Sequence, residues 1–132
     1  MPDVANPFRG LVGGRLAIWL EEAMVEYHRG KLRNCYDLTL LALNSSLWEL
    51  GAKGRGLFDR LRALQADGKI GPEVLERARE LPFPARHEAG ITDIDLSYLT
   101  VDDTRDWVGF LELFFRSLAA SGITLAGDPG RA

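Results

Sequence analysis

Residues 31–50 have the sequence KLRNCYDLTLLALNSSLWEL, and the architecture follows from them. Apolar residues recur in this segment at steps of three and four, which is the spacing of one face of an α-helix. Leu38, Leu41 and Ala42 widen that face until the middle of the segment is apolar almost all round. Because such a helix has neighbours on several sides, we expect it to be central. Gly51 is its expected end.

Helical periodicity continues on both sides of this central segment. Upstream, residues 16–27 place their apolar side chains on one stripe, which Arg29-Gly30 closes. Downstream, the leucines of residues 57–64 predict a short helix, and Gly71-Pro72 begins another that ends before the prolines at 82 and 84. Thr100 is the expected N-cap of a last helix, whose apolar stripe consists of Trp107, Phe110, Leu111, Phe114 and Leu118.

The predicted fold class is therefore all-α, an up-and-down antiparallel helical bundle of four to five helices. No strand pattern of any length competes with the helical one. We expect a single bundle over residues 15–122. The glycine- and proline-containing ends predict a flexible N-terminal arm over residues 1–14 and a flexible C-terminal tail over residues 123–132.

Charge and length exclude several classes of function. The 132 residues suit one domain, and a formal net charge of −3 argues against a globally basic nucleic-acid binder. Residues 29–87 carry eleven Lys/Arg and seven Asp/Glu, a net of +4, which leaves −7 for the rest of the chain. This basic middle forms a binding patch only if its cations cluster in space.

Cysteine content and hydropathy indicate the cellular compartment that we expect for this chain. Cys35 is the only cysteine, so an intramolecular disulfide is excluded, and we expect it to be a small core residue. No apolar run is long enough to cross a bilayer, and the first residues lack the basic and apolar pattern of a signal peptide. The expected location is the cytoplasm, and we expect neither a metal nor a cofactor.

The residues most suited to chemistry lie at the end of the fourth predicted helix and just beyond it: Arg77, Arg79, Arg86 and His87. Arginine and histidine together can bind phosphate. An imidazole whose pKa lies near neutral pH can also accept the proton of a ribose 2′-hydroxyl as that hydroxyl attacks phosphorus. Arginine can also stabilise the extra negative charge at phosphorus. The structural alternative is a solvated charge cluster at a helix end, which is the more frequent case.

Aromatic residues invite a similar comparison. Those of the last helix could stack on bases, but their helical spacing beside leucines is more typical of a core or of one side of a subunit interface. Tyr36 and Trp48 are expected to be packing residues. Phe83, held between two prolines, is a potential contact point for a partner.

Residues 22–90, EAMVEYHRGKLRNCYDLTLLALNSSLWELGAKGRGLFDRLRALQADGKIGPEVLERARELPFPARHEAG, resemble a bacterial family of unknown function within the HEPN superfamily. The shared features are a helix closed by a turn, a long buried helix, and a hairpin with Lys-Gly, a leucine and Arg-x-Leu. The resemblance extends over about residues 20 to 120. It implies a bundle of four or five helices that pairs as a homodimer.

In active members of that superfamily, an arginine and a histidine near the dimer seam carry metal-independent ribonuclease activity. The resemblance places His87 on the family histidine and Arg79 on the upstream arginine. Arg79 lies farther from His87 in sequence than in the best-known active members. Arg86 could substitute for it, although direct adjacency to His87 is not the family arrangement.

Several positions depart from the family pattern. Phe83 stands where the family often has asparagine, and Pro82 stands where it has glycine. Leu41 and Asn44 replace an arginine and a glutamate of the long helix. The missing asparagine removes a hydrogen-bond donor that could hold phosphate or orient the histidine. We therefore expect a degenerate site.

Two functions follow as expectations. The first is a non-catalytic HEPN-like module that forms a homodimer through its first or last helix and binds RNA or a protein, with Arg77 and Phe83 as contact residues. The alternative is a metal-independent ribonuclease of a toxin or defence system, with His87 as acid and base and with Arg79 and Arg86 holding phosphate. A small-molecule-binding bundle is a third possibility without a supporting motif.

Overall fold

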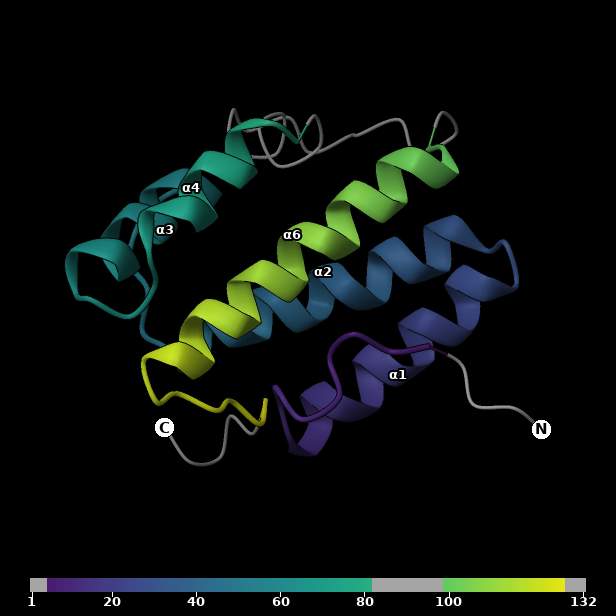
Figure 1. Cartoon of the computed structure of the whole chain (residues 1–132), viewed down its shortest axis with the longest axis horizontal. Helices are drawn as coiled ribbons and strands as arrows, with labels where there is room; N and C mark the ends of the chain where they lie inside the picture. The colour runs from purple at the N-terminus through teal and green to yellow at the C-terminus, as the bar shows by residue number, and fades with distance from the viewer. Residues whose placement is uncertain (1–4, 82–98, 128–132) are drawn as a thin grey trace.

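The chain folds as a bundle of α-helices. The computed structural model describes residues 5–81 and 99–127, and within these ranges it contains helices and no named strand. The helices are α1 (Gly14–His28), α2 (Leu32–Glu49), α3 (Leu57–Ala66), α4 (Pro72–Arg79) and α6 (Val101–Ala120) (Figure 1). The all-α bundle predicted from periodicity is confirmed, and the predicted ends of the central helix differ from α2 by one residue at each side.

In the part of the chain that the structure describes, the bundle consists of two helix pairs and the long helix α6. The short turn at Arg29–Lys31 folds α2 back along α1, and α3 and α4 form a smaller pair at one side (Figure 1). α6 lies against α2 and α4. α6 follows α2 in the same direction, since Trp107 contacts Thr39 in the first half of both helices and Gly127, beyond α6, contacts Glu49 at the end of α2.

The core lies where α6 meets α1, α2 and the α3–α4 pair. Its largest fully buried side chains include Trp107, Phe110, Leu111, Phe114 and Phe115 of α6 together with Leu16, Leu20, Leu43, Leu47, Leu61 and Leu64. The aromatic residues of α6 are therefore core residues of the protomer. This excludes them from a subunit interface, which was one of the two interpretations of their pattern.

A buried hydrogen bond fixes α6 against α2. The indole Nε1 of Trp107 donates to Oγ1 of Thr39 at 2.7 Å, and Thr39 is fully buried. The Thr39 hydroxyl in turn donates to the backbone carbonyl of Cys35, also at 2.7 Å. Both polar groups are thereby satisfied inside the core, where an unpaired donor or acceptor would be costly.

The segment before α1 packs on the bundle. Phe8 is only 1% exposed, and its ring meets the ring of Phe115 edge to face with 6.0 Å between centroids. Val12 forms an isolated parallel bridge with Leu125, which is also buried. Residues of both expected flexible ends thus contribute to the core, and the division of the chain at residues 14 and 122 stays a prediction.

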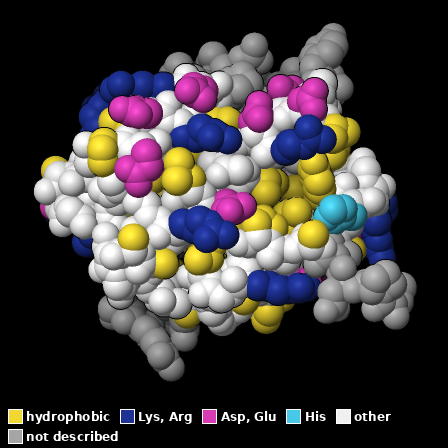
Figure 2. All heavy atoms as spheres, in the orientation of Figure 1, with side chains coloured by type: hydrophobic (Ala, Val, Ile, Leu, Met, Phe, Trp, Pro, Cys, Tyr) yellow, Lys and Arg dark blue, Asp and Glu magenta, His cyan; other side chains and the backbone are white. Residues whose placement is uncertain are grey.

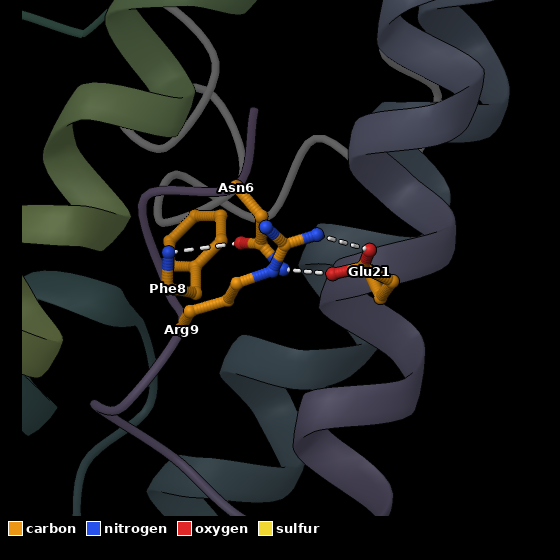
Figure 3. Close-up of polar contacts among 4 residues, drawn as sticks. All are labelled: Asn6, Phe8, Arg9 and Glu21. Carbon is orange, nitrogen blue, oxygen red and sulfur yellow. Dashed lines mark hydrogen bonds and ion pairs between the residues drawn. The ribbon is translucent and has the colours of Figure 1, made fainter. Parts of the chain in front are cut away.

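Polar contacts hold the same segment against α1. Asn6 and Arg9 both point towards Glu21 (Figure 3), with Arg9 Nη2 at 2.8 Å from Glu21 Oε1 and the Asn6 amide bonded to Oε2. The Asn6 side-chain oxygen accepts from the backbone N–H of Phe8 at 2.9 Å. The hydrogen bonds from Arg9 and then Asn6 hold the pKa of Glu21 below its ordinary value.

Helix ends follow the sequence signals. Thr100 caps α6 as predicted, since its hydroxyl accepts from the N–H of Asp103 at 3.0 Å and the Asp103 carboxylate accepts from the N–H of Thr100. Gly51 adopts a left-handed conformation (φ 66°) after α2, which an L side chain would strain. Within the described ranges, none of the helices combines the length and apolar character that crossing a bilayer requires.

Candidate functional site

The arginines of α4 diverge in space. Arg77 and Arg79 are both exposed in the last turn, two residues apart and thus on different sides of the helix. The Arg77 guanidinium lies over Gly109 of α6, with Nη2 3.2 Å from the place a Cβ would take. Arg79 instead borders a shallow groove between α3 and α4, beside Arg62. The two side chains therefore do not form one phosphate-binding cluster.

Three other predicted site residues, Phe83, Arg86 and His87, lie outside the described residues. Their roles as partner contact, phosphate ligand and acid/base stay predictions. The catalytic hypothesis thus has one residue, Arg79, that the structure places.

Charges are mixed over the face shown in Figure 2, where basic and acidic side chains alternate among hydrophobic ones. Several cations of the basic middle are paired within their own helix or across a turn. Arg62 lies 2.7 Å from Asp59, and Arg29 lies 3.4 Å from Glu26. This face therefore carries no broad patch of one sign, which an electrostatic surface for nucleic acid requires.

A stripe of exposed apolar side chains runs along the outer side of α2. Trp48 is 60% exposed and Leu41 is 46% exposed, with Asn44 and Ser45 between them. The prediction of Trp48 as a packing residue is wrong. Residues 41 and 48 are seven positions apart, which is two helical turns, and they therefore lie on the same face of α2. The opposite face of α2 is buried and consists of Thr39, Leu43, Ser46 and Leu47.

A pocket lies at the elbow where α2 turns into α3. Its walls come from α2, from the loop that ends at Gly56, and from the first turn of α3, with Trp107 of α6 beneath. The cavity volume is about 50 Å³, and the lining residues are Tyr36, Leu40, Leu43, Asn44, Leu47, Arg55, Gly56, Leu57, Arg60 and Trp107. We refer to it as the elbow pocket.

Sequence reasoning missed the elbow pocket because residues 51–56 have the composition of a linker. Two arginines close together in sequence, Arg55 in that loop and Arg60 one turn into the next helix, could have indicated a binding site there. Tyr36 at the pocket wall has a pKa raised to about 12, chiefly by burial and further by the charge of Asp37.

Cys35 is a core residue of the bundle. Cys35 is fully buried, and burial raises the pKa of its thiol to about 12, which leaves it protonated and inert at neutral pH. The prediction of a core cysteine is confirmed. In the described ranges, no group of three or more His, Cys, Asp or Glu side chains is placed to hold a metal ion.

Comparisons with protein-family models, with curated proteins and with solved structures found no match for this chain. The resemblance to the HEPN superfamily therefore rests on the sequence pattern of about residues 20 to 120 alone.

Proposed function

We propose that this chain is a non-catalytic HEPN-like helical module that works by association, and that its first partner is a second copy of itself docked on α2. The observation that carries the proposal is the pair Leu41 and Trp48, large apolar side chains 46% and 60% exposed on one stripe of the central helix. Tryptophan is enriched among the residues that dominate binding energy at protein interfaces.

The spacing of the stripe suits a two-fold interface. The midpoint between residues 41 and 48 falls between Asn44 and Ser45. A second α2 laid antiparallel about that point therefore places each Leu41 against Trp48 of the other copy. Such an arrangement is isologous, because the same patch meets itself. The polar pair at the centre sets the register.

Charges at the two ends of the stripe complement each other in this arrangement. Asp37 lies one turn before Leu41, and Lys53 lies just beyond the end of α2. Both side chains are exposed, and neither forms an ion pair within the described residues. The antiparallel copy brings Asp37 of one protomer towards Lys53 of the other.

An RNA partner has weaker support than a second copy. The formal net charge is −3, and basic and acidic side chains alternate over the face in Figure 2. A protein that neutralises several phosphates needs unpaired cations gathered on one surface. We therefore propose a second copy, and not RNA, as the partner.

Self-association is tested by sedimentation equilibrium and light scattering over micromolar concentrations. We expect a dimer, and we expect Leu41→Asp and Trp48→Ala each to raise the dissociation constant by about tenfold or more. Val101→Asp is the matched control, because Val101 is 50% exposed and lies on α6. A strict monomer, or equal weakening by the Val101 variant, contradicts the proposal.

The non-catalytic part of the proposal has its own test. The pure protein incubated with mixed RNA in the presence of a chelator should leave the RNA intact, as seen on a denaturing gel. RNA cleavage by the wild type that disappears in His87→Ala would instead establish the ribonuclease alternative. Arg79→Gln would then show whether the one described residue of that site takes part.

A further inference from the structure

The elbow pocket combines an apolar floor with a cationic rim. Tyr36, Leu43, Leu47, Leu57 and Trp107 line it and are all at most 6% exposed. The polar rim consists of Asn44 from α2 and Arg55 and Arg60 from the loop and α3. No acidic side chain is among the described lining residues. An apolar floor beneath a few convergent polar groups is a common arrangement in small-molecule sites.

The arginines of the rim keep donors available. Arg60 is half-buried, and its Nε donates to the backbone carbonyl of Gly54 at 3.3 Å, which orients the guanidinium and leaves its terminal nitrogens without a described partner. Arg55 is exposed and has no hydrogen bond or ion pair among the described residues. The nearest carboxylate along α3, that of Asp59, is occupied by Arg62 at 2.7 Å.

We infer that the elbow pocket binds a small organic oxyanion, a carboxylate or phosphate carried on a short apolar group. Arg55 and Arg60 would hold the oxyanion head, since a guanidinium matches carboxylate and phosphate oxygens two at a time, and the Asn44 amide would add a neutral donor. The apolar group would enter between the leucines and Trp107.

Size limits the ligand. A volume of about 50 Å³ holds a few water-sized groups, so an alkyl chain of two or three carbons fits. An aromatic ring does not fit, because a cavity that binds benzene measures about 150 Å³, and a nucleoside is larger still. The apolar floor also disfavours a bare inorganic anion, because a charge buried without enough partners is costly. The ligand therefore needs both an apolar group and an oxyanion. Asn44 also lies at the centre of the proposed α2 dimer, whereas Arg55 and Arg60, which carry this inference, lie outside the stripe of Leu41 and Trp48.

The indole N–H of Trp107 gives a local readout. Trp107 lies at the floor of the pocket, whereas Trp19 and Trp48 do not line it. Titration of the ¹⁵N-labelled full chain with propionate and with ethyl phosphate should shift the Trp107 indole signal in NMR, with dissociation constants in the millimolar range typical of fragments. The relative affinities of the two compounds distinguish a carboxylate from a phosphate head.

Two omission controls test each half of the ligand. Inorganic phosphate lacks the apolar group and 1-propanol lacks the charge, so both should bind at least about tenfold more weakly than the complete ligand. Equal binding of either compound overturns the inference, as does the absence of any Trp107 shift with propionate and ethyl phosphate.

Substitution locates the site. We expect Arg55→Gln and Arg60→Gln each to weaken binding by about tenfold, because each removes one charge-assisted contact. The matched control is Arg62→Gln, which makes the same change of charge on α3 at a residue that does not line the pocket. Retained binding in both pocket variants, or an equal loss in the Arg62 variant, contradicts the assignment. The amide spectrum of each variant shows whether it is folded.

Discussion

Phe8→Ala should lower the free energy of unfolding by about 3–5 kcal/mol, the usual cost of removing a buried aromatic side chain. Phe8 is 1% exposed and packs on Phe115 in the core, although it lies within residues expected to form a flexible arm. Urea denaturation followed by circular dichroism measures the change. A loss this large is a substantial part of the stability of a domain of this size.

The neighbouring Arg9→Gln variant is the control for Phe8. Arg9 is exposed and pairs with Glu21 on the surface, so its loss should lower the free energy of unfolding far less than Phe8→Ala does. Because the folded state lowers the pKa of Glu21, this contact stabilises the fold above the ordinary carboxyl pKa and is lost as pH falls through the lowered value. If Phe8→Ala and Arg9→Gln lowered the free energy of unfolding equally, the segment before α1 would not be packed against the core.

Thr39→Val should lower the free energy of unfolding by about 1–3 kcal/mol. The substitution keeps the shape of the side chain but removes the hydroxyl that accepts from Nε1 of Trp107 at 2.7 Å. The indole N–H then stays in the core without a partner. Urea denaturation gives the free energy, and the chemical shift of the Trp107 indole proton reports the lost hydrogen bond directly.

Two variants separate this hydrogen bond from general packing effects. Ser46→Ala removes another fully buried hydroxyl of α2, one that donates only to the backbone carbonyl of Ala42, and should cost less. Trp107→Phe removes the donor itself. In a double-mutant cycle, Thr39→Val should therefore cost less in the Trp107→Phe background. Strictly additive effects would show that the hydrogen bond contributes nothing to stability.

The helices follow from local sequence. Apolar residues at steps of three and four, Gly30 and Gly51 at helix ends and the capping box of Thr100 are signals contained within a few turns of chain. They were sufficient to predict the helical segments that the structure describes and the burial of Cys35.

Local signals could not assign every aromatic residue. Trp48 and Trp107 both lie at helical spacing beside leucines, yet Trp48 is 60% exposed and Trp107 is 1% exposed. A nearly all-apolar helix such as α2 has more apolar side chains than its neighbours cover. Which of them remain exposed depends on where α1, α3 and α6 pack, and these contacts join segments distant in sequence.

The sequence by itself therefore determined the secondary structure and the class of fold, because hydrophobic periodicity and caps act over one or two turns. Only the tertiary structure decided that Phe8 belongs to the core, that Arg77 and Arg79 face different neighbours, and that Arg55 and Arg60 share a pocket over Trp107. The physical reason is that burial and proximity are set by the packing of whole helices against one another, which no short window of sequence contains.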